Sequence, residues 1–197
     1  MKKGDVESDR RRDPKAPATA RVATGKTGRR LDAFDTLLTL SEVSLGLAGF
    51  AGIVVVFGRG PGALAPADSF RLLALVGCSL GTLFLSLVPI ALNAVGLQEP
   101  ELWQWSSAIL LAVAVPAHLF AFLRIRRHVA EILEVLPIYM LPIGVSLFLA
   151  NFIAQICNAL GVGSLPIFGV YLIGLILYLG FAALQFARML FVRPGGS

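Results

Sequence analysis

Five long apolar stretches, separated by short polar or Gly/Pro-rich segments, dominate the pattern of hydrophobic and polar positions along the chain. Each stretch spans 22 to 24 residues, which as a helix reaches about 33 Å and crosses the hydrocarbon core of a bilayer. None shows the polar–apolar alternation of membrane barrel strands. The pattern predicts transmembrane helices at residues 36–57, 72–95, 102–123, 136–158 and 166–187.

The composition agrees with this interpretation. The 197-residue chain is 56% hydrophobic and 15% charged, whereas soluble domains carry about 25% charged residues. A soluble domain of this size could not bury so much apolar surface, and in lipid the backbone must satisfy its own hydrogen bonds. We therefore expect an all-α, polytopic membrane helix bundle with the lipid bilayer as its surroundings.

The basic charge is concentrated at the N-terminus. Residues 1–30 hold ten of the seventeen Lys and Arg residues, four acidic residues, and neither an aromatic residue nor Leu or Ile. This composition predicts a disordered tail, followed by a bundle at 31–192 and a free C-terminal end at 193–197. The tail is interpreted either as a contact to anionic lipid headgroups, worth about 1 kcal/mol per cation, or as a solvated segment that helps to set topology. No nucleic-acid partner is expected.

Alternating crossings place seven arginines on one face of the membrane. They are Arg59, Arg71, Arg124, Arg126, Arg127, Arg188 and Arg193. The positive-inside rule assigns this face to the cytoplasm, which leaves the basic tail outside. Two alternatives resolve the conflict: either the tail is translocated, or the first segment is re-entrant and bends at Gly46, Gly49 and Gly52.

Polar side chains inside the bilayer are costly and generally face protein or a water-filled cavity. In the alternating arrangement most of them gather in the leaflet opposite the arginines. We expect a polar pocket lined by Glu42, Asn93, Asn151, Gln155, Asn158 and Tyr171. In the alternative interpretation, Glu42 lies at headgroup depth and the amides form interhelical hydrogen bonds, worth about 0.6–2 kcal/mol each.

The first apolar segment also carries small residues at a spacing of four. Ser44, Ala48 and Gly52 predict a face on which a second helix can approach closely.

Motifs for catalysis or cofactor binding are missing from the sequence. It has no Walker loop, GxGxxG, HExxH or GxSxG motif, and its two cysteines are not spaced as metal ligands. We therefore expect no catalytic residues, no cofactor, no metal and no enzymatic activity.

Two runs of residues carry a resemblance: Leu40 to Val54, which contains the pattern E-x-x-x-x-L-A-G-F-x-G-I from Glu42 onward, and the later run from Gln185 to Leu190. Over about residues 33–192 the chain resembles a family of small, uncharacterised bacterial inner-membrane proteins that share a first helix of the type E-x-x-x-x-L-A-G-F-x-G-I. The longer basic tail departs from that family. The resemblance implies a multi-pass protein of the bacterial inner membrane and brings no known activity.

Two functions remain open at this point. The first is a non-enzymatic interaction or assembly subunit, which binds its own copies or another membrane protein through small-residue faces. The second is a small proton or cation carrier or channel, which uses Glu42 and the Asn/Gln cluster.

Overall fold

The computed structural model describes residues 18–58, 66–127, 140–162 and 167–191, with side chains described for most residues from Asp32 onward but not at several helix ends. The described residues form five helices and no strand. The helices are α1 (Ala18–Gly58), α2 (Pro66–Ala94), α3 (Glu101–Arg127), α5 (Met140–Ala159) and α6 (Ile167–Phe191). The predicted all-α helix bundle is confirmed.

Contacts divide the chain into two units, Met1–Ala33 and Phe34–Ser197. Residues 1–17 of the predicted disordered tail lie outside the described residues. Residues 18–30, which the sequence analysis also assigns to the tail, are helical as the first part of α1. They contain Ala, Arg and Lys, which favour helix, and no proline. The predicted free end at 193–197 lies outside the described residues.

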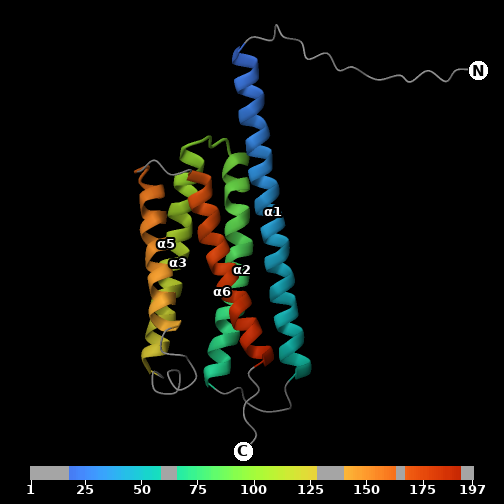
Figure 1. Cartoon of the computed structure of the whole chain (residues 1–197), viewed down its shortest axis with the longest axis vertical. Coiled ribbons are helices and arrows are strands. Elements are labelled where there is room, and N and C mark those ends of the chain that lie inside the picture. Colours follow the sequence, from blue (N-terminus) through green and yellow to red (C-terminus); the bar gives the residue numbers. More distant parts are fainter. Residues whose placement is uncertain (1–17, 59–65, 128–139, 163–166, 192–197) are drawn as a thin grey trace, which may run out of the picture. The chain divides into compact units, whose positions relative to one another are not determined.

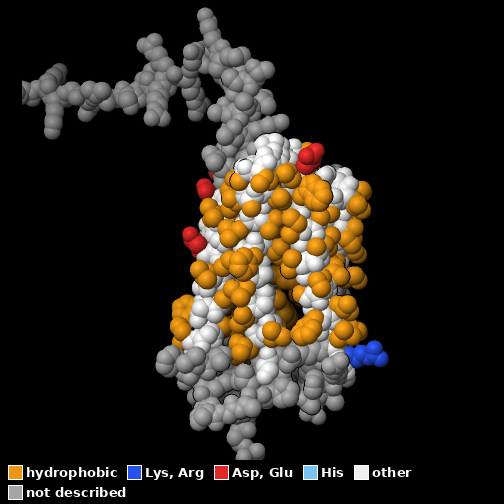
Figure 2. Space-filling model, turned by 180° about the vertical axis from the view of Figure 1, so that it is seen from behind, with side chains coloured by type: hydrophobic (Ala, Val, Ile, Leu, Met, Phe, Trp, Pro, Cys, Tyr) orange, Lys and Arg blue, Asp and Glu red, His pale blue; other side chains and the backbone are white. Residues whose placement is uncertain are grey.

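Within the second unit, successive helices run in alternating directions (Figure 1). Helix α6 packs extensively on α2 and also contacts α3 and α5, while α3 contacts α2 and α5. One face of each of these four helices is therefore buried against the others, and α1 buries Leu37, Ser44 and Ala51. The opposite faces carry hydrophobic side chains, which cover much of the described surface (Figure 2). This inversion of the usual soluble pattern is expected when lipid is the solvent.

Four described helices are long and apolar enough to cross a membrane, as a multi-pass membrane protein requires. The spans are Asp32–Ile53, Arg71–Ala94, Glu101–Leu123 and Ile167–Leu190. The predicted fourth segment differs, because residues 136–139 lie outside the described residues and α5 contributes a shorter apolar stretch, Gly144–Ala159. At 20 residues, α5 is still about 30 Å long.

Helix α1 continues through Gly46, Gly49 and Gly52 without a break. A re-entrant first segment would need a bend at these glycines. The continuous helix favours a crossing instead, since its span matches those of the other helices.

A glycine turn joins α2 to α3. Gly96 has φ +98°, a region that L side chains rarely adopt, and its N–H donates to the carbonyl of Asn93. The N–H of Leu97 donates to the carbonyl of Leu92. These bonds cap the end of α2 and reverse the chain for α3.

We expect the chain to stay in the membrane pellet after alkaline carbonate treatment and to enter solution in detergent. The physical reason is the apolar outer surface of the spans, which water cannot solvate. Centrifugation followed by immunoblotting measures the partition. A chain that is monomeric and dispersed without detergent would contradict the membrane assignment.

Candidate functional site

Four side chains from two helices form one hydrogen-bonded group, which we call the amide cluster: Ser107 of α3 and Asn151, Gln155 and Asn158 of α5. All four are buried. The Ser107 hydroxyl donates to Gln155 Oε1 (2.8 Å) and accepts from Asn158 Nδ2 (2.8 Å). A serine hydroxyl has one donor and two lone pairs, so Ser107 can donate to Gln155 and accept from Asn158 at the same time, and it links the two amides.

The amide cluster also bonds to the backbone of α6. Gln155 Nε2 donates to the carbonyl of Val170 (2.8 Å), and Asn158 Nδ2 donates to that of Ile167 (3.1 Å). Gln155 Nε2 lies 3.4 Å from Asn151 Oδ1, a longer bond within α5. The cluster therefore joins α3, α5 and α6.

Gly174 makes this approach to α6 sterically feasible. A Cβ at this position would collide with Gln155 Nε2 and lie 3.0 Å from Asn151 Oδ1. Because Gln155 is held by Ser107 and Val170, its amide cannot move away without losing those bonds. A small residue is thus required where α5 crosses the start of α6.

Tyr171 extends the polar contacts to α2. Its side chain is fully buried, and its hydroxyl donates to the carbonyl of Leu85. Its ring lies 6.1 Å from that of Trp103, which is also buried and whose Nε1 donates to Glu99 Oε1 (2.9 Å). Asn93 is half-buried near the end of α2. Polar groups thus lie in one half of the bundle, where α2 and α5 end and where α3 and α6 begin. The alternating topology predicts this placement.

The chemistry of the amide cluster is that of a structural clamp. It contains amides and one hydroxyl but no titratable group, and the described residues contain no group of three His, Cys, Asp or Glu that could hold a metal. Its hydrogen bonds are made to its own members and to backbone carbonyls. The sequence predicts its three amides as pocket residues and places Ser107 in the same leaflet. The hydrogen bonds of Ser107 and the close approach at Gly174 depend on three-dimensional proximity.

Glu42 lies elsewhere. Its side chain is exposed on the outer surface of the bundle, and no described residue forms a hydrogen bond or ion pair with it. Glu42 and the buried Ala51 are nine residues apart, which places them on opposite sides of α1, about 180° apart. The structure therefore brings Asn151, Gln155 and Asn158 together but does not bring Glu42 to them.

The depth of Glu42 follows from its neighbour Val43, which lines the same pocket as Ile176 of α6. Ile176 lies nine residues, or about 14 Å, from the start of the span Ile167–Leu190. Glu42 itself is the eleventh of the 22 residues of the apolar span Asp32–Ile53, near the middle of that span. Its side chain is therefore exposed on the outside of the bundle, within an apolar span.

The three residues of the predicted small-residue face of α1 differ in burial. Ser44 is fully buried and Ala48 half-buried, but Gly52 is exposed. Steps of four residues advance about 40° beyond a full turn, so a run of such steps leaves the buried face. The buried line instead follows Leu37, Ser41, Ser44 and Ala51, and Ala51 packs in one core cluster with Leu75 and Ala182.

The arginines of the predicted cytoplasmic face are partly described. Arg71 at the start of α2 is buried and lies near the half-buried Arg188 of α6. Arg126, in the last turn of α3, is exposed. Arg124 and Arg127 belong to the same turn, whereas Arg59 and Arg193 lie outside the described residues. Arg71, Arg126 and Arg188 thus lie at the end of the bundle opposite the amide cluster.

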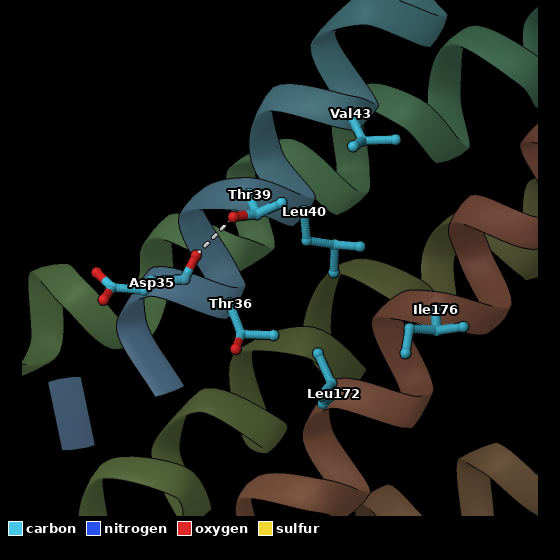
Figure 3. A pocket seen from close by; sticks show the side chains of 7 residues that line it. All are labelled: Asp35, Thr36, Thr39, Leu40, Val43, Leu172 and Ile176. Atoms are coloured by element: carbon cyan, nitrogen blue, oxygen red, sulfur yellow. Dashed lines mark hydrogen bonds between the residues drawn. The ribbon is translucent and has the colours of Figure 1, made fainter. Parts of the chain in front are cut away.

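A shallow lateral pocket of ≈ 410 Å³ lies between α1 and α6. Thr36, Leu40 and Val43 of α1 face Leu172 and Ile176 of α6 (Figure 3). The carboxylate of Asp35 points away from the pocket, and Thr39 Oγ1 donates to the Asp35 carbonyl (3.0 Å). The pocket is mainly apolar and holds no arrangement of groups for catalysis.

Comparison with models of known protein families, with curated proteins and with solved structures finds no match to this chain.

We expect Gly174→Ala to lower the thermal unfolding midpoint in detergent by about 2–8 °C. The added methyl displaces the Gln155 amide, at a cost of about 1–2 kcal/mol in the free energy of unfolding. Gly180→Ala is the matched control, because Gly180 lies in the same helix with open space around its Cβ position. Equal midpoints for the two variants would contradict the clamp.

Proposed function

We propose that the chain is a non-enzymatic assembly subunit of the bacterial inner membrane, whose α1 binds another transmembrane helix through its outer face. We call the residues Leu38, Glu42, Leu45, Gly46, Gly49 and Ile53 the outer face. Each is exposed, and all lie within about 60° of Glu42 around the helix axis. The bacterial location rests on the family resemblance.

The single observation that carries the proposal is the position of Glu42. A carboxylate at the bilayer centre costs about 2.5–3.5 kcal/mol on insertion scales. Charged groups in membrane spans normally face a protein partner or water, yet Glu42 points away from its own bundle. A second helix on the outer face would remove Glu42 from lipid and offer it a hydrogen bond.

The glycines on this face favour the same function. A Cβ at Gly46 or Gly49 would meet nothing within 4 Å, so neither glycine is needed for packing within the chain. Small residues at such spacing allow helix backbones to approach closely. Their place beside Glu42 is explained by a partner helix.

The carrier or channel alternative has less support. It needs Glu42 and the Asn/Gln cluster to line one pathway, whereas Glu42 is exposed on α1 and the amide cluster is engaged in hydrogen bonds between α3, α5 and α6. No observation in the described residues favours it over assembly.

For orientation, we propose that the arginine end faces the cytoplasm, following the positive-inside rule. The N-terminus then lies on the opposite side, where its cations can contact anionic lipid headgroups. This corresponds to the alternative in which the tail is translocated.

We expect proton flux into proteoliposomes to equal that of protein-free vesicles, both for the wild-type chain and for Glu42→Gln. An assembly subunit provides no pathway across the bilayer. A pH-sensitive dye inside the vesicles measures the flux. Wild-type flux well above the protein-free level, lost in Glu42→Gln, would favour the carrier instead.

We expect a photoreactive benzoylphenylalanine at Phe50 to crosslink to protein in native membranes. Phe50 is 62% exposed and neighbours Gly49, so a helix on the outer face lies within its reach. The matched control is Phe84 of α2, which is 65% exposed and should crosslink to lipid. Immunoblotting and mass spectrometry identify the products. Lipid adducts alone at position 50 would contradict the proposal.

A further inference from the structure

We propose that the arginine end of the bundle holds a binding site for a phospholipid headgroup, formed by Arg71 of α2 with Gln185 and Arg188 of α6. The ligand is a phosphodiester that also carries a hydroxyl group, as in phosphatidylglycerol. The site uses none of the residues of the outer face of α1, so it is independent of the assembly function.

The packing of α2 on α6 brings the three side chains to one level of the bundle. The two helices run antiparallel and pack extensively (Figure 1), and Leu75 of α2 shares a core cluster with Ala182 of α6. Arg71 precedes Leu75 by four residues, on the same side of α2. Gln185 follows Ala182 by three residues, on the same side of α6. Each therefore lies about one turn beyond the core cluster, toward the same end, and Arg188 lies one turn farther along α6.

This level of the bundle corresponds to the depth of lipid phosphates. Arg71 is the first residue of the apolar span Arg71–Ala94, and Arg188 lies two residues before the end of the span Ile167–Leu190. The ends of such spans meet the polar headgroup region that borders the hydrocarbon core. A phosphate of a surrounding lipid can therefore reach both guanidinium groups.

The two arginines together favour an anion. Arg71 is 8% exposed and Arg188 is half-buried, and they are close enough for their like charges to interact. An anion beside both guanidiniums lowers the cost of holding these charges together. Each guanidinium has five N–H donors in a geometry that fits phosphate, so Arg71 can bind a phosphate in addition to its contacts within the chain. Basic pockets between transmembrane helices bind anionic headgroups in this way.

Gln185 adds a requirement for a hydrogen-bond donor on the ligand. Its side chain is 5% exposed, and its Oε1 has no hydrogen-bond partner among the described residues. A buried acceptor without a donor is costly. Ionised phosphodiester oxygens are acceptors and cannot satisfy it, whereas a headgroup hydroxyl can donate to it. An ammonium headgroup would also donate, but it would bring a third cation to the two guanidiniums. A hydroxyl beside the phosphate is therefore the group that fits.

The test measures phosphatidylglycerol binding to the purified, delipidated full-length chain by native mass spectrometry in a non-ionic detergent. Arg188→Gln should weaken binding about 10-fold, because it removes charge-assisted hydrogen bonds to the phosphate. Arg188→Lys keeps the charge without the bidentate geometry and should lose less. The matched control is Arg126→Gln, since Arg126 is an exposed arginine at the same end of the bundle and its removal should leave the affinity unchanged.

A second probe tests the role of Gln185. Phosphatidylmethanol has the same phosphodiester charge as phosphatidylglycerol but no headgroup hydroxyl. The wild-type chain should bind phosphatidylglycerol about 2- to 10-fold more tightly than phosphatidylmethanol, because one hydrogen bond distinguishes them. Gln185→Leu should abolish this preference. The unfolding midpoint of each variant checks that it folds, and the basic N-terminal tail is the same in all of them, so it cannot produce the differences.

The contrary outcomes are distinct. Equal phosphatidylglycerol affinity in the wild-type chain and Arg188→Gln, or an equal loss in Arg188→Gln and Arg126→Gln, would overturn the site. A preference for phosphatidylglycerol that survives Gln185→Leu would overturn the hydroxyl contact. Displacement of bound phosphatidylglycerol by glycerol 3-phosphate at similar concentrations would overturn the lipid as the ligand and assign the site to a free phosphate ester. None of these results bears on the Phe50 crosslink, so the assembly function stands or falls separately.

Discussion

The need to satisfy polar groups without water governs this structure. Inside a bilayer an unpaired polar group is costly, and the chain meets this requirement in two ways. Hydroxyls on α1 and α2 bond to backbone carbonyls of their own helix, as Ser44 does to Leu40 and Thr82 to Cys78. The amides of α5 are satisfied between helices, through Ser107 and through the carbonyls of Ile167 and Val170. These contacts specify how α3, α5 and α6 are placed against one another.

Among the described residues, some polar groups depart from this arrangement: Ser79 Oγ, Tyr178 Oη and Gln185 Oε1 are buried without a hydrogen-bond partner, and Glu42 is exposed. The amides lie where two or three helices converge, so their polarity is used within the chain. Glu42 lies on the side of α1 that faces away from the bundle, next to glycines that no neighbour requires. Polarity and small size on an outer face serve no purpose in the isolated chain, but both are useful at a helix–helix interface.

The two ends of the bundle differ in chemistry. One end carries the amide cluster, Tyr171 and the Gly96 turn, and Arg71, Arg126 and Arg188 lie toward the other. Helix α2 connects them: its buried line includes Arg71, Leu75, Ser79, Thr82 and Ser86, and it packs extensively on α6. This packing, with the Tyr171 bond to Leu85, holds the two halves of the bundle in register.

The sequence by itself determined the membrane environment and the helical class, because long apolar runs have few other stable solutions. It also placed Asn151, Gln155, Asn158 and Tyr171 in one half of the bundle, since alternating crossings follow from chain order. Only the tertiary structure decided which way each side chain faces. Because each residue turns the helix by about 100°, a small error in assigning the buried face of a helix changes which side chains point into the bundle. In α1, Ser44 is buried, whereas Gly52 and Glu42 are exposed. Tertiary structure also decided that Ser107 bonds to both Gln155 and Asn158, and that a Cβ at Gly174 would collide with Gln155. Both contacts join segments that are distant in the sequence, so a local sequence pattern cannot predict them.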